Sequence, residues 1–138
     1  MLRLWPATVR ADFCQIHWPV SFANKTGVTM PTDPETNIFM LQDVPLSSTW
    51  AAMEKLVQAG KIRSIGVSNF NVAKLEEVCK SATIMPAVNQ YEMHPYFQQP
   101  ELEKYHKEKG IIGAAYSPLG NNIYGLPRYV IDGIYEKV

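Results

Sequence analysis

Short apolar runs alternate with amphipathic helical stretches along this chain at a nearly constant interval. The last three runs begin near Arg63, Pro86 and Ile111, which are 23 and 25 residues apart, and one helical pattern fills each gap. Parallel strands need a crossover connection of this length, usually an α-helix, because the chain must return to the same end of the sheet. The spacing therefore predicts consecutive βαβ units in a parallel sheet.

An earlier apolar run extends from Asp12 to His17, and the Trp18-Pro19 pair that follows it is expected to end a buried strand. The next segment, Val20 to Pro45, contains several Gly, Pro, Asn and Asp residues and shows no sustained period. It predicts a long loop, and loops of this length are usually functional or linkers. The expected architecture is an α/β protein with four strands and three helices.

Each expected helix has its own start and stop signals. The residues suited to begin the three helices are Ser47 or Ser48, Asn71 and Pro100. The glycines suited to end helices are Gly60 and Gly110. The apolar stripes expected to face the sheet are Trp50, Met53, Leu56 and Val57 in the first helix and Val72, Leu75, Val78 and Cys79 in the second.

The composition favours one ordinary globular domain. The 138 residues include 13 basic and 13 acidic side chains, and 46% of the residues are hydrophobic. Zero net charge gives no electrostatic reason to expect nucleic acid or an anionic membrane as a partner. Because we see neither a membrane-spanning run nor a secretory signal, we expect a cytoplasmic protein. Residues 1–11 are expected to be a poorly ordered start.

Disulfide and metal chemistry are not expected. Cys14 and Cys79 lie in short apolar contexts without CxxC spacing, which favours two buried thiols over a disulfide or a metal pair. Glu92, His94 and His106 have metal-ligating side chains, but their spacing is generic and His106 belongs to an expected helix. We therefore predict no metal site.

A polar or aromatic pair directly follows each expected strand. These pairs are His17-Trp18, Ser68-Asn69, Asn89-Gln90 and Tyr116-Ser117. One such pair would more often mean only that the chain emerges into water. Because the carboxyl ends of parallel strands meet at one edge of the sheet, where α/β proteins bind ligands, the four pairs together predict a shared site.

The residue types at the strand ends suit a nicotinamide. His17 fits a proton donor or a hydrogen-bond donor to a carbonyl oxygen. The Asn and Gln amides match the edge of a carboxamide, and the ring of Tyr116 can stack on a flat heterocycle. The chain has no Gly-rich dinucleotide loop and no P-loop.

Four ordered segments resemble the aldo-keto reductase family. They are IHWPV (16–20), GKIRSIGVSNF (60–70), PAVNQYEMHPY (86–96) and AAYSPLG (114–120). The resemblance extends from about Asp12 to Arg128, and residues 129–138 form a divergent tail. It implies a (β/α)₈ TIM barrel that reduces aldehydes and ketones, such as aldoses or glyceraldehyde, with NADPH. The hydride would come from the nicotinamide and the proton from a tyrosine.

The resemblance also implies roles for individual residues. His17 would orient the substrate carbonyl, and Trp18 would line the substrate pocket. The implied cofactor-binding residues are Ser68, Asn69 and Gln90 at the carboxamide, Tyr116 on the nicotinamide ring, and Ser117, Leu119 and Asn121 along the phosphates. The segment from Val20 to Pro45 resembles the substrate loop of members that act on small aldoses and polyols.

Only part of the family's barrel is expected in this chain. Four of eight strands make about half a barrel. The family's aspartate, proton-donating tyrosine and lysine belong before the HWP strand, and the residues that grip the 2′-phosphate belong after the YSPLG strand. We therefore expect this truncated chain to be inactive alone, and its open sheet edges to favour self-association.

Two other interpretations remain open at this point. The chain could be a non-catalytic protein of the same fold that senses a nucleotide or binds a partner, and an assay of aldehyde reduction separates this from a reductase. It could also be a four-stranded doubly wound domain with another ligand. The order of the strands in the sheet tests that interpretation.

Overall fold

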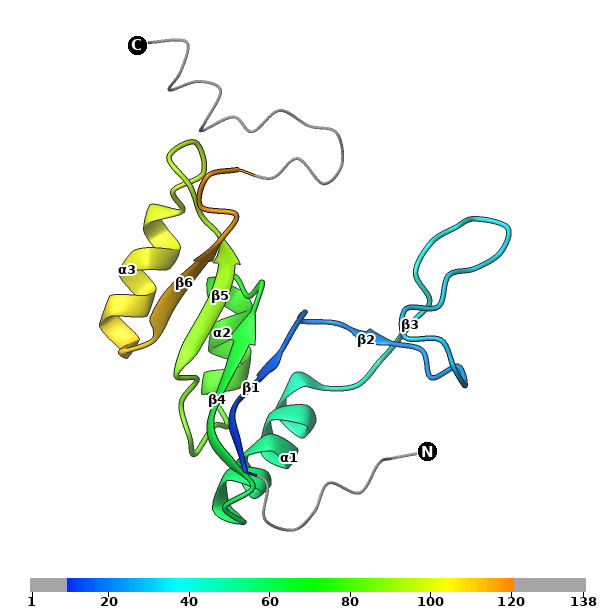
Figure 1. The fold of residues 1–138 in the computed structure, drawn as a ribbon, viewed down its shortest axis with the longest axis horizontal. Helices are drawn as coiled ribbons and strands as arrows, with labels where there is room; N and C mark the ends of the chain where they lie inside the picture. Colours follow the sequence, from blue (N-terminus) through cyan, green and yellow to red (C-terminus); the bar gives the residue numbers. More distant parts are fainter. Residues whose placement is uncertain (1–9, 121–138) are drawn as a thin grey trace.

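A four-stranded parallel sheet forms the centre of the molecule (Figure 1). The computed structural model describes residues 10–120 of the chain. The strands, in their spatial order, are β1 (Ala11–Ile16), β4 (Ile62–Ser68), β5 (Val88–Glu92) and β6 (Ile112–Tyr116). Every neighbouring pair is parallel, so the predicted βαβ architecture is confirmed. β1 begins one residue earlier than predicted and β5 two residues later than Pro86.

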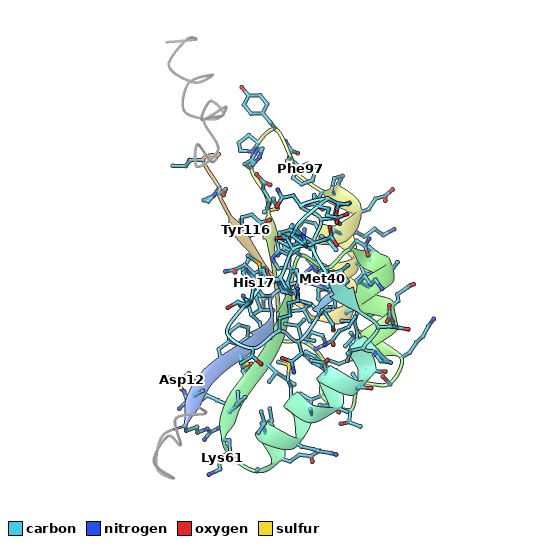
Figure 2. All side chains as sticks on the ribbon, turned by 90° about the vertical axis from the view of Figure 1, so that its right-hand side faces the viewer. Asp12, His17, Met40, Lys61, Phe97 and Tyr116 are labelled. Atoms are coloured by element: carbon cyan, nitrogen blue, oxygen red, sulfur yellow. The ribbon has the colours of Figure 1, made fainter. Side chains whose placement is uncertain are left out.

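Three helices connect the strands and cover one face of the sheet (Figure 2). They are α1 (Leu46–Gln58), α2 (Val72–Cys79) and α3 (Pro100–Lys109). Because the spatial order of the strands follows the chain order, right-handed crossovers place every helix on the same side. This is the arrangement of a barrel segment, since a doubly wound sheet has helices on both faces.

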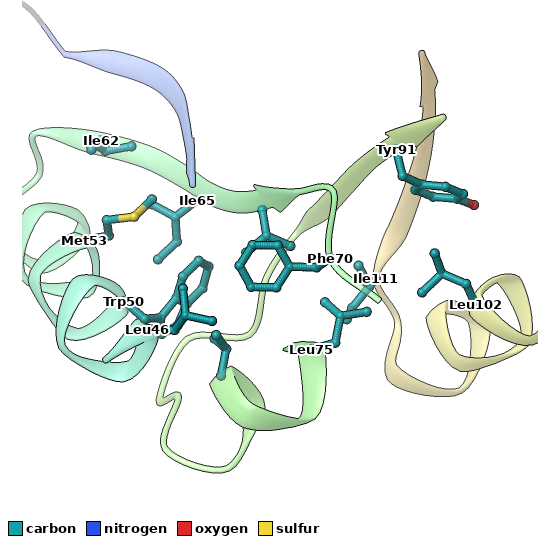
Figure 3. Close-up of a cluster of buried hydrophobic side chains, with 12 residues drawn as sticks. Leu46, Trp50, Met53, Ile62, Ile65, Phe70, Leu75, Tyr91, Leu102 and Ile111 are labelled. Carbon is teal, nitrogen blue, oxygen red and sulfur yellow. The ribbon is translucent and has the colours of Figure 1, made fainter. Parts of the chain in front are cut away.

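The hydrophobic core lies between the sheet and the helices (Figure 3). Its largest fully buried apolar side chains are Trp50, Phe70, Ile65, Leu75, Val67 and Val78. The indole Nε1 of Trp50 also donates to the carbonyl oxygen of Ile84 at 3.0 Å, which ties α1 to the loop before β5. No helix in residues 10–120 has the length and apolar character that a membrane span needs.

The capping signals of α2 and α3 act as predicted. Asn71 accepts a hydrogen bond from the backbone N–H of Lys74 at 2.9 Å, and Pro100 occupies the first position of α3. Gly60 and Gly110 follow α1 and α3 with φ of 68° and 69°, a left-handed conformation that glycine adopts without steric cost.

The start of α1 differs from the prediction. Neither Ser47 nor Ser48 caps it, because the helix begins at Leu46, with Pro45 at the N-cap position and no side-chain cap. Leu46 is buried in the core, so packing extends the helix beyond the serines. Leu56, expected in the apolar stripe, is 44% exposed, and Glu54 is buried instead.

The cysteines and the long segment also require corrections. Cys14 and Cys79 are free thiols, as predicted, but they are half-buried rather than buried. The segment from Val20 to Pro45 is not structureless, because it contains an antiparallel pair, β2 (Ser21–Phe22) and β3 (Leu41–Gln42). This hairpin projects away from the sheet (Figure 1). The expectations for residues 1–9 and 129–138 fall outside the described residues, and Ala11 already belongs to β1.

Glu54 links α1 to the segment before β5. Its Oε1 accepts hydrogen bonds from the backbone N–H groups of Thr83 and Ile84, each at 2.7 Å. Desolvation raises the pKa of Glu54, but the hydrogen bonds from Ile84 and Thr83 outweigh it and hold the pKa below its ordinary value of 4.5. The charged carboxylate therefore stabilises the folded chain.

Replacing Glu54 with Gln should destabilise the fold at neutral pH by about 1–2 kcal/mol, because charge-assisted hydrogen bonds are stronger than neutral ones. A lowered pKa means that this contribution is complete above pH 4.5 and is lost as pH falls through the folded-state pKa. Urea unfolding of the unmodified chain and of Glu54→Gln should show a difference in the free energy of unfolding at pH 7, and this difference should become smaller in acid. An equal difference at both pH values would contradict this account.

Candidate functional site

An open groove of about 830 Å³ lies over the carboxyl ends of the four parallel strands. Figure 2 shows His17 and Tyr116 at this end of the sheet and Asp12 and Lys61 at the other. Six of the residues singled out from the sequence line the groove, namely His17, Trp18, Ser68, Asn69, Gln90 and Tyr116. The β2–β3 hairpin segment adds Phe22, Thr29 and Met30 to one wall, together with Val20.

Asn69 connects residues in or directly after all four strands, although Gln90 lies in the middle of β5 rather than at its end. Its side-chain Nδ2 donates to the carbonyl oxygen of His17 at 2.9 Å and to Ser68 Oγ at 3.2 Å. Its Oδ1 accepts from the hydroxyl of Tyr116 at 2.8 Å, and its backbone N–H donates to the carbonyl oxygen of Gln90 at 2.8 Å. Asn69 has φ of 62°, in the left-handed region where Asn is enriched. The local turn thus places this amide at the centre of the groove floor.

Ser68 and Gln90 lie beside Asn69. Ser68 is almost fully buried, and its hydroxyl donates to the Gln90 carbonyl oxygen at 2.8 Å. The Gln90 side chain accepts a hydrogen bond at Oε1 from Gln15 Nε2 at 3.2 Å. This bond leaves the Gln90 amide nitrogen available as a donor. Hydroxyl and amide groups therefore present both donors and acceptors to the groove.

Two residues at the groove were not predicted from the sequence: Glu92, which was considered only as a metal ligand, lines the groove, and Gln15 hydrogen-bonds to the Gln90 side chain. Both could have been found from strand alternation, because side chains two residues apart point to the same face. Gln15 lies two positions before His17, and Glu92 lies two positions after Gln90.

Tyr116 remains a protonated phenol in this site. Desolvation raises the pKa of its hydroxyl, and the nearby carboxylate of Glu92 raises it further. A protonated hydroxyl can donate to Asn69, as the structure shows. The ring of Tyr116 lines the groove and is available for stacking.

His17 and Trp18 occupy the open side of the groove. Both side chains are exposed, with Trp18 at 45%, and their ring centroids are 6.0 Å apart. The exposed imidazole of His17, next to the half-exposed indole of Trp18, can form a hydrogen bond with a polar group that enters the groove from solvent.

The remaining sequence candidates do not line the groove. Ser117 has φ of 48° and forms a turn in which its carbonyl oxygen accepts from the N–H of Gly120. Leu119 is 54% exposed, and neither residue contributes to the groove wall. Asn121 lies outside the described residues.

Asn89, the neighbour of Gln90, is also outside the groove. It is fully buried on the helix side of the sheet, where its amide contacts the backbone of Phe70. Glu92 and His94 form a pair at 3.5 Å, while His106 lies buried under β5. In residues 10–120, no three His, Cys, Asp or Glu side chains converge as a metal site would require.

Comparisons with known proteins point to one family. The family model described as "Aldo/keto reductase family" matches residues 7–126. The chain is 50% identical over 128 residues to an uncharacterized oxidoreductase of Schizosaccharomyces pombe, covering 89% of this chain and 39% of the relative. It is 54% identical over 114 residues to the NAD(P)H-dependent D-xylose reductase I,II of Candida tropicalis, covering 79% of this chain and 35% of the relative.

A solved structure agrees with the sequence matches. The aldose reductase of Giardia lamblia superposes with a TM-score of 0.76 at 42% identity, covering 81% of this chain and 36% of that one. This likeness supports the parallel α/β sheet as a segment of the family's barrel. The chain spans 35–39% of the length of the two named relatives.

Proposed function

Because the chain belongs to the aldo/keto reductase family, we propose that its groove is the nicotinamide end of a carbonyl reductase site. The reaction is the NADPH-dependent reduction of an aldehyde or ketone, with small aldoses or glyceraldehyde-like compounds as substrates. The observation that carries this proposal is the convergence of residues from all four strands on Asn69 in one groove.

The donor set of the groove fits a nicotinamide. A carboxamide offers one acceptor and one donor face, and Ser68, Asn69 and Gln90 supply hydroxyl and amide groups of both kinds. The flat ring needs an aromatic surface, which Tyr116 supplies. When bound, NADPH supplies the hydride.

His17 and Trp18 act on the substrate in this proposal. The His17 imidazole donates a hydrogen bond to the substrate carbonyl oxygen and so sets its orientation. Trp18, half-exposed beside it, provides an apolar wall. The hairpin residues Phe22 and Met30 also line the groove.

Binding of parts of the cofactor tests whether the groove recognises the nicotinamide. We expect the chain to bind reduced nicotinamide mononucleotide and NADPH with similar weak affinity, because the described contacts address only the nicotinamide end. Adenosine 2′,5′-bisphosphate should not bind. A ligand at a hundred times its Kd adds about 2.7 kcal/mol to the free energy of unfolding. Because we expect weak binding, tens of micromolar NADPH do not approach this ratio and should leave Tm unchanged.

Gln90→Leu is the matching variant for this experiment. It removes the amide from the groove, and titration calorimetry should show at least tenfold weaker binding of the mononucleotide. Gln58→Leu, on the exposed end of α1, is the control and should bind as the unmodified chain does. Tight binding of the adenosine fragment, or normal binding by Gln90→Leu, would show that the groove does not read a nicotinamide.

We also propose a cytoplasmic location and self-association. The free thiols of Cys14 and Cys79 are typical of a reducing compartment, and cell fractionation tests the location. Self-association rests on the sheet edges, and its test is given in the Discussion.

A further inference from the structure

A buried hydrogen-bonded chain extends from helix α3 to the groove floor. Asn89 in β5 is fully buried and clamps both polar groups of the Phe70 backbone. Its Nδ2 donates to the carbonyl oxygen of Phe70 at 2.9 Å, and its Oδ1 accepts from the N–H of Phe70 at 3.4 Å. Phe70 directly follows Asn69, so this clamp holds one side of the left-handed turn at the groove floor.

These two bonds determine the protonation of His106. If the Asn89 amide were reversed, its NH₂ group would face the N–H of Phe70 and its oxygen would face the carbonyl oxygen of Phe70. Neither pair can form a hydrogen bond, so Nδ2 faces the carbonyl. The same Nδ2 lies 3.0 Å from Nε2 of His106, which is 2% exposed. Since Nδ2 is a donor, Nε2 must accept, and the imidazole is neutral with its proton on Nδ1.

The surroundings of His106 favour this neutral form. Burial lowers the pKa of His106, while Glu103 opposes that shift. Nδ1 lies 3.8 Å from Glu103 Oε1 on the same helix, which is beyond hydrogen-bond distance, and it has no other hydrogen-bond partner within residues 10–120. Glu103 accepts a hydrogen bond from the hydroxyl of Tyr91 in β5. Glu103 and Tyr91 are the titratable groups that face the imidazole from α3 and β5.

Gly113 in β6 makes room for this cluster. A Cβ at Gly113 would lie 2.7 Å from Glu103 Oε1, 3.0 Å from the Tyr91 hydroxyl oxygen and 3.3 Å from His106 Nδ1. Such distances leave no space for a side chain. β5, β6 and α3 therefore pack tightly around one polar network under the groove.

We propose that His106 and Asn89 are positioning residues of the nicotinamide groove, with neutral His106 orienting the Asn89 amide that holds Phe70 and thereby sets Asn69. The functional part of this inference rests on the function proposed above. The structural part, that the state of His106 controls the geometry of Asn69, does not depend on any ligand.

NMR of the unmodified chain tests the structural part without a variant. Imidazole ¹⁵N shifts should identify His106 as the Nδ1–H tautomer at neutral pH. On acidification, an Nε2–H would face the Asn89 Nδ2–H₂, donor against donor. The Asn89 and Asn69 amide signals should then change with the same midpoint as His106. A His106 titration that leaves the Asn69 signals unmoved would overturn the proposal.

Two variants separate positioning from packing. His106→Leu keeps an apolar volume but removes the acceptor, and should shift the Asn69 signals. His106→Gln supplies an acceptor oxygen and should restore them. Tyr105→Leu is the control, because Tyr105 is a half-buried residue of the same helix α3 with no hydrogen bond to Asn89, and it should leave the signals unchanged. Equal effects of the Leu and Gln variants would assign His106 to packing alone.

Binding of reduced nicotinamide mononucleotide tests the functional part. His106→Leu should weaken binding about tenfold, and His106→Gln should recover most of it. If no form of the chain binds the mononucleotide while Asn69 still follows His106, the proposed function fails and the positioning network stands. If binding is normal in His106→Leu, the positioning role is overturned.

Discussion

The 138-residue chain alone is expected to reduce no simple aldehyde with NADPH at a measurable rate. Reduction of a carbonyl needs a hydride and a proton delivered in one geometry, and a positioned general acid typically contributes about 10²–10⁴-fold. The family's proton-donating tyrosine and its lysine have no counterpart motif in this sequence. His17 is exposed at the open side of the groove, where water weakens each hydrogen bond to the substrate.

Supplying the absent strands tests this explanation. A single polypeptide that adds the N-terminal strands with the aspartate, tyrosine and lysine, and the remaining C-terminal strands, should oxidise NADPH in the presence of an aldehyde. His17→Ala in that protein should reduce kcat/KM by about 10²-fold or more, whereas the control Gln58→Ala should not change it. Turnover by the isolated chain within the ordinary range of about 1–10³ s⁻¹ would contradict the prediction. So would a completed barrel that is indifferent to His17→Ala.

The isolated chain is also expected to self-associate in solution. Within residues 10–120, β1 and β6 each pair with one neighbour only, so both edges of the sheet carry unpaired backbone groups. The face of the sheet opposite the helices exposes apolar side chains, with Phe13 at 42% and Ile112 at 64%. In a closed barrel such residues fill the interior. Sedimentation velocity should therefore show dimers or larger species.

Charge placed on this face should reduce the association. Burying one Ile side chain is worth about 1.5–3 kcal/mol, so Ile112→Lys should weaken self-association at least tenfold. Leu56→Lys is the matched control, because Leu56 is 44% exposed on α1, away from this face, and should have little effect. A monomeric chain with sharp near-UV dichroism and no binding of hydrophobic dyes would count decisively against self-association.

Local signals predicted most of the secondary structure. Asn71 begins α2 because its side chain satisfies a free N–H within three residues, and Gly110 ends α3 because it adopts a left-handed conformation. The strand spacing indicated a parallel sheet for a similar reason, since a crossover helix sets the interval between strands. These signals involve residues close together in the chain, and no tertiary contact is needed to recognise them.

Packing between distant segments determined where α1 begins and that β2 pairs with β3, which the local signals did not predict. Leu46 extends α1 past the expected serine caps because the core buries it, and Ser21–Phe22 pairs with Leu41–Gln42 only because the intervening segment folds back. Each outcome depends on residues far apart in the sequence. The hydrophobic contacts or backbone pairs formed there outweigh local capping preferences of about 1 kcal/mol.

Asn89 and Gln90 show the same difference between local sequence signals and tertiary packing at the candidate site. The residue pattern placed both amides at one strand end, and the family resemblance assigned only Gln90 to the cofactor. Alternation along β5 sends Gln90 to the groove and Asn89 to the helix side, where it meets Phe70 and His106. Sequence alone determined that amides gather at this end of the sheet. Only the tertiary structure showed that Asn89 meets Phe70 and His106 rather than the groove, because a strand's two faces are distinguished by what packs against each of them.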